Sequence, residues 1–206
     1  MENMKAVRVH NYGGREVLRF EDAPRPTPGS GELLIMVHAA SVNPIDWKVR
    51  AGYMKDYIPL PMPFIPGWDV SGVVEVVGSG VTKFKKGDEV YARPDVTAHG
   101  YGAYAEYVVA KERETALKPK SIDHVHATTI PVGAVTAWRA LFDTAGLKEG
   151  PWQKILEGLP SVVCVRNAVV ADASGGFAPI LPKAATATSS RSKSRSTRKS
   201  RPTKKS

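Results

Sequence analysis

The stretch AASVNPIDWKVRAG, residues 39–52, decides the fold of this chain together with IPGWDVSGVVEVVG, residues 65–78. Within the first stretch, Pro44 and Gly52 bracket a segment that is predicted to form a short helical turn. The second stretch reads as a strong strand that ends at Gly78. A short helix between two strands is therefore expected near the centre of the folded part.

Short strands dominate the sequence around these two stretches. Residues 32–40 carry apolar side chains on both alternating faces, which predicts burial on both sides, as in a closed barrel or packed sheet. Further strands are predicted over residues 4–10, 17–21, 68–77, 89–92 and 104–109, and the proline-rich residues 53–66 are predicted to be extended loop. Two helices follow, over residues 121–130 with Ser121 as N-cap and over residues 132–145. This order predicts a mainly β fold with helical additions.

Three glycines, Gly67, Gly72 and Gly78, accompany the second stretch. They could be mistaken for glycines of a phosphate-binding loop. Their spacing along a strand instead predicts tight corners and close approach of neighbouring backbones.

Charge and composition divide the chain into a neutral body and a basic tail. Lys and Arg number 29 and Asp and Glu number 20, and the tail from residue 173 onwards holds nine of the basic residues and no acidic one. Residues 186–206 are therefore predicted to be disordered, and they could attract nucleic acid only without sequence specificity. A solvated tail without a partner is the preferred interpretation, so nucleic acid is not expected as a partner.

The remaining composition bears on location. The single Cys164 excludes an intramolecular disulfide, and no apolar window is long enough for a membrane span. No secretory signal is recognised at the N-terminus. A cytoplasmic protein is expected, or a nuclear one if the basic tail serves import.

The two stretches resemble a known family when three further segments are added: GDEV at residues 87–90, GAYAEYV at 102–108 and PVGAVTAWRAL at 131–141. Together they resemble the N-terminal, substrate-side domain of the medium-chain dehydrogenase/reductases, in the zinc-free, quinone-oxidoreductase-like branch. The resemblance implies a GroES-like, partly open β-barrel over residues 1–150. Residues 151–185 are predicted to be irregular, and whether they are genuine or the product of a frame shift stays open.

The resemblance implies an oxidoreductase that uses NADP(H) to reduce quinones or activated enones and carbonyls. A dinucleotide site needs a strand, a G-x-G-x-x-G/A turn and a helix N-terminus. The candidates GSG at residues 78–80, GYG at 100–102 and GG at 175–176 all lack this context. The Rossmann domain is therefore predicted to be absent, and the chain to bind NADP(H) poorly and to be inactive. The alternative is a non-enzymatic fragment or interaction module.

Zinc-dependent relatives place a cysteine near the position of Asn43 and a His-Glu pair at the positions of Trp68 and Asp69, so no catalytic zinc is expected here. The best remaining ligand pair is His124 and His126. Two residues at this spacing diverge on a helix, so they are interpreted as polar residues at a helix start rather than as a metal site.

By resemblance, Asn43 and Thr136 are candidate cofactor-binding residues beside the nicotinamide, where an amide and a hydroxyl offer donors and acceptors without charge. From the residues alone, Asn43 could equally serve a turn and Thr136 could pack in its helix. Trp47, Lys48 and Tyr53 are candidates for the substrate cleft, with ordinary packing as the alternative. Many relatives carry tyrosine at the position of Lys48, so no catalytic proton donor is assigned.

One consequence of a missing neighbouring domain is exposed apolar surface. Trp138, Leu141 and Phe142 recur on the predicted second helix and are expected to be partly uncovered. Such a surface would favour association between copies of the chain.

Overall fold

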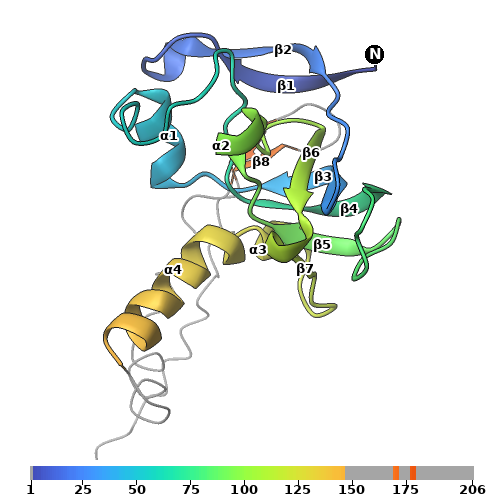
Figure 1. Ribbon diagram of the computed structural model, residues 1–206. Helices are drawn as coiled ribbons and strands as arrows, with labels where there is room; N and C mark the ends of the chain where they lie inside the picture. The colour runs from blue at the N-terminus through green and yellow to red at the C-terminus, as the bar shows by residue number, and fades with distance from the viewer. Residues whose placement is uncertain (1, 147–168, 172–176, 180–206) are drawn as a thin grey trace, which may run out of the picture.

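The computed structural model describes residues 2–146, 169–171 and 177–179. Its N-terminal part is an antiparallel hairpin of β1 (Asn3–Val9) and β2 (Leu18–Pro24), which run alongside each other in Figure 1. A 3₁₀ turn, η1 (Arg15–Val17), leads into β2. Both predicted strands are confirmed, and β2 extends further toward its proline than the sequence indicated.

The second sheet has five antiparallel strands in the order β6-β3-β4-β5-β7. Their bounds are Glu32–Ala40 for β3, Val70–Val77 for β4, Glu89–Ala92 for β5, Tyr107–Lys111 for β6 and Thr115–Leu117 for β7. The predictions for β3 and β5 are confirmed to the residue, whereas β7 was missed. A 3₁₀ turn, η2 (Glu112–Glu114), connects β6 to β7.

The predicted start of β6 at Tyr104 was wrong, for a tertiary reason. The backbone carbonyl of Tyr104 accepts a hydrogen bond from Val7 at 2.8 Å, and Ala105 forms an isolated bridge with Ala6. Residues 104 and 105 therefore bond to the N-terminal hairpin, Glu106 bonds to both Lys5 of β1 and Val37 of β3, and regular pairing with β3 begins only at Tyr107. The hairpin and the larger sheet are joined by such bridges, so the fold is two open sheets that partly enclose a core.

The core confirms that β3 is buried on both faces. Leu33, Leu34 and Ile35 are all buried, although consecutive side chains point to opposite sides. One apolar cluster fills the five-stranded sheet, and another, which includes Phe64 and Trp68, lies beneath α1. The core therefore fixes the C-terminal end of β3 and the N-terminal end of β4, and the candidate site lies beside these two ends.

Close backbone approach is confirmed at the three glycines. Gly67 has φ of 110°, and a Cβ there would lie 2.7 Å from the backbone nitrogen of Ala103. A Cβ on Gly78 would lie 1.9 Å from the carbonyl oxygen of Gly29. These glycines serve packing of the sheet, as the spacing predicted.

Short helices connect the strands. The predicted turn is α1 (Pro44–Arg50), followed by Gly52 with φ of 84°. The prediction of Ser121 as a helix N-cap was wrong: α3 (His124–Ala127) begins after Asp123, whose carboxylate accepts a hydrogen bond from the backbone of His126 at 2.8 Å. Asp123 directly precedes the first helical residue, so its carboxylate, rather than the hydroxyl of Ser121, caps the N-terminus of α3.

Two further local features differ from the expectations. Helix α2 (Val96–His99) was not predicted; it is a single turn in which the Asp95 side chain accepts a hydrogen bond from the backbone of Ala98. Residues 53–58 form turns rather than extended loop, with the backbone N–H of Ile58 donating to the carbonyl of Met54 at 2.7 Å. Prolines therefore restrict the chain only after this point, from residue 59 onward.

The helix predicted over residues 132–145 is confirmed and begins slightly earlier. It consists of π-helical turns η3 (Ile130–Ala134), the α-helical turn α4 (Val135–Trp138) and π-helical turns η4 (Arg139–Thr144), with Gly146 following at φ of 65°. Figure 1 shows this segment, here called the projecting helix, extending away from the sheet.

The exposure predicted for the projecting helix is found. The exposed fractions are 48% for Val135, 60% for Trp138 and 40% for Leu141. Phe142 is half-buried, with its ring centroid 4.3 Å from that of Trp138. Association between copies through this apolar surface stays a prediction.

In the remaining described residues, β8 (Val169–Ala171) and β9 (Phe177–Pro179) form a two-stranded antiparallel sheet. The predictions for residues 186–206 and for the glycine pair at 175–176 lie outside the described residues. Within the described ranges, all named strands pair in antiparallel fashion, so none belongs to a parallel, dinucleotide-binding sheet. No helix in those ranges combines the length and the apolar character that a membrane crossing needs.

Candidate functional site

A buried carboxylate, Asp69, organises the candidate site from the start of β4. Its exposed fraction is 1%, and its two oxygens accept hydrogen bonds from three different segments. Oδ2 accepts from the Ser41 hydroxyl at 2.5 Å and from the Asn43 side-chain amide at 2.6 Å. Oδ1 accepts from the backbone N–H of Val132 at 2.9 Å. One carboxylate thus connects the end of β3, the N-terminus of α1 and the first turn of the projecting helix.

Asn43 is held at the N-terminus of α1 by bonds from both its backbone and its side chain. The backbone N–H donates to the Asp46 carboxylate at 2.6 Å, the reciprocal half of a capping box. The side-chain amide donates to Ser41 Oγ at 3.1 Å as well as to Asp69. Its N–H groups therefore point into the protein. A turn-forming role for Asn43 is shown, and a cofactor role stays a prediction.

Two neighbouring carboxyl groups at this site have raised pKa values. Burial raises the pKa of Asp46 to about 6, and the negative charge of Asp69 adds to the effect. Burial also raises the pKa of Asp69, although the hydrogen bonds from Ser41 and Asn43 oppose that shift. The site therefore keeps two acidic groups close together in a poorly solvated region.

The Asp46→Asn variant is expected to lose a pH dependence of stability. The raised pKa means that folded Asp46 holds its proton more tightly than unfolded Asp46 does. Its stabilising contribution is therefore full below pH 3.8 and is lost as pH rises through about 6. The loss amounts to about 3 kcal/mol, since each pKa unit corresponds to about 1.4 kcal/mol. Asparagine keeps an acceptor for the Asn43 backbone but does not ionise.

Urea unfolding at about pH 4 and about pH 7 measures this difference. The wild-type chain should lose more stability between the two values than the Asp46→Asn variant, and the exposed Asp56→Asn variant should follow the wild type. Equal pH dependence of wild type and Asp46→Asn would contradict the assignment.

The structure places the other predicted site residues in two groups. Trp47, Lys48 and Tyr53 lie together on an exposed patch around α1: the Trp47 and Tyr53 rings meet edge to face at 5.9 Å, and Lys48 Nζ lies 5.8 Å from the Trp47 ring. Thr136 is exposed on the projecting helix, about one turn beyond Val132. Since Val132 and Asn43 both bind Asp69, the base of this helix lies beside Asn43.

The two histidines separate as the helix geometry predicted. His124 contacts Ser71 Oγ through Nδ1 at 2.8 Å and Glu89 through Nε2 at 3.2 Å, and its ring lies 4.6 Å from that of His38. Burial and the nearby His38 lower the pKa of His124. His126 instead contacts the N-cap of α3. Among the described residues, no group of three or more His, Cys, Asp or Glu side chains could hold a metal ion.

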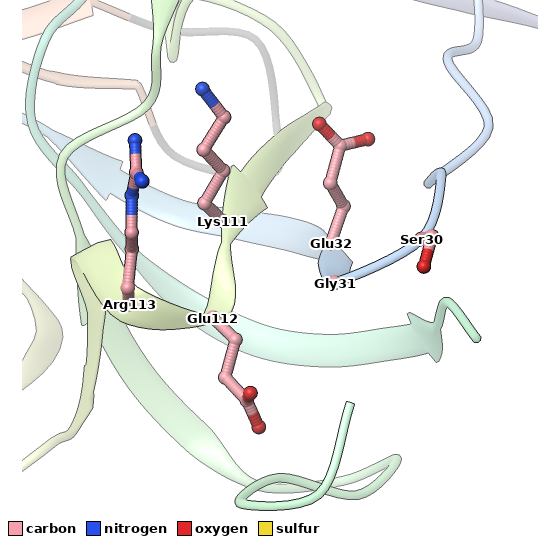
Figure 2. A pocket seen from close by; sticks show the side chains of 6 residues that line it. All are labelled: Ser30, Gly31, Glu32, Lys111, Glu112 and Arg113. Atoms are coloured by element: carbon pink, nitrogen blue, oxygen red, sulfur yellow. The ribbon is translucent and has the colours of Figure 1, made fainter. Parts of the chain in front are cut away.

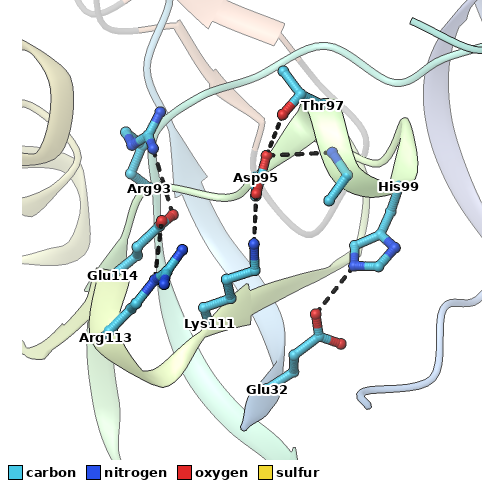
Figure 3. A network of polar contacts seen from close by, with 9 residues as sticks. Glu32, Arg93, Asp95, Thr97, His99, Lys111, Arg113 and Glu114 are labelled. Atoms are coloured by element: carbon cyan, nitrogen blue, oxygen red, sulfur yellow. Dashed lines mark hydrogen bonds and ion pairs between the residues drawn. The ribbon is translucent and has the colours of Figure 1, made fainter. Parts of the chain in front are cut away.

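A hollow with a volume of about 340 Å³ lies at the opposite end of β3 (Figure 2). Its lining residues are Ser30, Gly31, Glu32, Lys111, Glu112 and Arg113. Figure 3 shows the neighbouring charges paired: Asp95 accepts from Lys111 at 2.7 Å and from the Thr97 hydroxyl at 2.5 Å, and His99 contacts Glu32 at 3.0 Å. Burial alone would raise the pKa of Asp95, but these donors hold it at about 2. The network ties α2 to the sheet.

Comparison with known proteins agrees with this architecture. Residues 29–120 match the alcohol dehydrogenase GroES-like domain. A chloroplast envelope quinone oxidoreductase homolog of Arabidopsis thaliana is 39% identical over 176 residues, which cover 84% of this chain and 49% of that protein. The chain belongs to the medium-chain dehydrogenase/reductase superfamily. Within that superfamily it groups with the quinone oxidoreductases.

Solved medium-chain dehydrogenase/reductases share the fold. The human synaptic vesicle membrane protein VAT-1 homolog-like protein matches with a TM-score of 0.66 and 35% identity, over 72% of this chain and 46% of that one. A mycobacterial protein solved in complex with NADPH matches with a TM-score of 0.61 and 36% identity, over 70% and 42% of the two chains. The chain spans about half the length of the curated relatives it matches.

The central position of Asp69 in the site was not predicted from the sequence. Asp69 entered the sequence argument only as the residue at the second position of the His-Glu pair. A signal was available, because Asp69 is a single charge within the apolar stretch from Trp68 to Val74. Such a residue is buried only when it is hydrogen-bonded, so partners from other segments could have been sought.

Proposed function

We propose that this chain supplies the substrate-side half of an NADP(H)-dependent reductase that acts on quinones or activated enones and carbonyls without zinc. The observation that carries the proposal is the Asp69 carboxylate, which binds Asn43 and the base of the helix that bears Thr136. It lies where zinc-dependent relatives have the glutamate of the His-Glu pair, and its hydrogen bonds go to the protein itself. The quinone oxidoreductase relatives support the reaction class.

In this proposal, NADPH supplies the hydride when it is bound. Asn43 and Thr136 would hold the nicotinamide through uncharged hydrogen bonds, with Asn43 contributing its amide oxygen because its N–H groups donate to Ser41 and Asp69. Trp47 and Tyr53 offer exposed aromatic faces against which a planar quinone ring could stack, and Lys48 lies beside them. Asp69 acts as a positioning residue, because it reaches the cofactor only through Asn43 and the helix.

The domain assignment is part of the same proposal: a GroES-like domain over residues 1–150, an irregular segment over 151–185 and a basic tail over 186–206. The described residues contain no strand–turn–helix unit for a dinucleotide. We therefore infer that the chain by itself binds NADP(H) weakly and turns over slowly or not at all. A non-enzymatic interaction module is the alternative.

A fluorescence titration of the full chain with NADPH, combined with a quinone-reduction assay, tests the activity part. The expected result is no saturation at micromolar NADPH and turnover at the uncatalysed rate. Saturable micromolar binding with turnover would overturn the inference of inactivity while supporting the reductase assignment.

The site residues are tested by supplying the part of the Arabidopsis relative that this chain does not match as a separate chain. Restored quinone reduction should fall about tenfold in the Thr136→Ala variant, because a hydrogen bond to the cofactor is lost. Thr144→Ala changes an equally exposed threonine on the same helix and should leave the rate unchanged. Binding without any restored reduction would favour the interaction module.

A further inference from the structure

Strand β2 forms the outer edge of the N-terminal sheet. That sheet is two-stranded, and β1 uses its far side for other segments. The backbone N–H of Val7 donates to the carbonyl of Tyr104 at 2.8 Å. Val9 and Phe64 exchange backbone hydrogen bonds at 2.8 and 3.1 Å. Figure 1 shows β2 at the rim of the molecule, beyond β1, so its second edge faces outward.

The hairpin register shows which backbone groups lie on this outer edge. Val7 faces Phe20, and the N–H of Val7 points away from β2. The two residues are therefore a non-hydrogen-bonded pair, in which the N–H and C=O of Phe20 also point away from the partner strand. Because the two kinds of pair alternate along a ladder, Leu18 and Asp22 share this orientation with Phe20.

Most of these outward groups have no partner. The N–H of Leu18 is taken by the carbonyl of Arg15. For the Leu18 carbonyl and for both groups of Phe20 and Asp22, the described part of the chain offers no backbone hydrogen bond. A strand edge with free N–H and C=O groups is a template for another strand. Phe20, with 60% of its surface exposed, lies at the centre of this edge.

The face of β2 opposite Phe20 carries two charges, Arg19 and Glu21. Glu21 is held within the hairpin, because its Oε1 contacts Arg8 at 3.1 Å and His10 at 2.6 Å. Arg19 directly faces Arg8, and no carboxylate among the described residues forms an ion pair with it. Facing like charges are unfavourable, so Arg19 gains from a carboxylate supplied from outside the hairpin.

We propose that β2 pairs with the β2 strand of a second copy of this chain, in antiparallel fashion about a twofold axis at Phe20. The two hairpins then form one four-stranded sheet, and each copy contributes the same surface. The two Phe20 residues exchange a pair of backbone hydrogen bonds, and the N–H of each Asp22 donates to the Leu18 carbonyl of the other copy. This contact uses neither the projecting helix nor the proposed NADP(H) site, so it can fail separately from both.

The charges select this register. Arg19 lies opposite Glu21 of the second copy at a non-hydrogen-bonded position, where facing side chains come closest. A shift by two residues keeps the outward groups matched, but it places the two Arg19 side chains, or the two Glu21 side chains, opposite each other. The centred register also brings the two exposed Phe20 rings together and removes apolar surface from water. Because the contact is small, we expect a dissociation constant on the order of 10–100 µM.

Sedimentation equilibrium of the full chain tests the register with two charge variants. Arg19→Glu turns both facing pairs into like charges and should weaken dimerisation at least about tenfold, and Glu21→Lys should do the same. An equimolar mixture of the two variants restores opposite charges at both positions and should associate as tightly as the wild type. A wild-type chain that stays monomeric up to about 1 mM, or a mixture no better than its components, would overturn the proposal.

A matched control separates the contact from net charge. Lys120→Glu makes the same change in net charge at an exposed lysine outside the hairpin and should leave dimerisation unchanged. Arg19→Glu sets a carboxylate opposite Arg8 of its own hairpin, so its monomer should stay folded, which circular dichroism checks. Equal weakening by Arg19→Glu and Lys120→Glu would also overturn the proposal.

Hydrogen exchange locates the contact. The Phe20 amide points outward in the monomer, so it should exchange several-fold more slowly at concentrations where the dimer forms than in dilute solution. The Glu21 amide points toward β1 and should be protected at both concentrations. An unchanged rate at Phe20 despite association would place the contact on another surface and would overturn the assignment.

Discussion

Replacing Gly72 by alanine is expected to cost about 4 kcal/mol of unfolding free energy or more, which places it among the most damaging single substitutions. A Cβ at this position in β4 would lie 2.0 Å from the carbonyl oxygen of Met36 and 2.9 Å from a side-chain methyl of Ile35. The Met36 atom belongs to the backbone of β3 and cannot rotate away. The two paired strands must therefore separate, which breaks backbone hydrogen bonds between them and disturbs the apolar cluster that both strands contribute to.

Urea unfolding followed by circular dichroism measures the loss. The control is Gly133→Ala, where nothing beyond the adjacent residues and the helix's own backbone lies within 4 Å of the added Cβ. Alanine there should stabilise the chain by up to about 1 kcal/mol, because glycine is a poor residue inside a helix. A Gly72→Ala variant as stable as the wild type would show that β3 and β4 are not packed as described.

The Asp69→Asn variant should lose about 3 kcal/mol of stability and loosen the projecting helix. Asp69 accepts from Ser41, Asn43 and Val132, so every partner donates. An asparagine side chain has a single acceptor oxygen, and its NH₂ group must face a donor in either orientation. Each such mismatch leaves buried donors unpaired, which costs about 1–3 kcal/mol per group.

Hydrogen exchange at the Val132 amide distinguishes this mechanism from general destabilisation. Val132 should exchange faster in Asp69→Asn than the loss of global stability accounts for. Asp143→Asn provides the control on the projecting helix, because its exposed ion pair with Arg139 at 3.8 Å should contribute less than about 1 kcal/mol. Uniform acceleration throughout the protein would mean that the carboxylate does not anchor the helix.

The success and failure of the strand predictions have one physical explanation. Strands β3 and β5 have sharp boundaries because local apolar patterns and turn residues delimit them. The start of β6 could not be found locally, since Tyr104 and Ala105 alternate as a strand should but bond to the hairpin. The partner of a backbone group is set by long-range pairing, which a local pattern does not contain.

The candidate site shows the same division. Two sequence stretches were sufficient to name Asn43, Trp47, Lys48 and Tyr53 as candidates, because these residues lie within or beside one short helix. Thr136 came from a separate segment, and nothing in its spacing from Asn43 indicated that Asp69 would connect the two. Hydrogen bonds between residues dozens of positions apart depend on the folded chain.

By itself, the sequence determined the superfamily, the mainly antiparallel architecture and the close-packed glycines, because motif order and local periodicity are properties of the chain. Only the tertiary structure decided that Asp69 is shared by three segments and that Asp46 is buried close to it. The physical reason is that burial and hydrogen-bond satisfaction depend on every segment that surrounds a group, and those neighbours are assembled only when the chain folds.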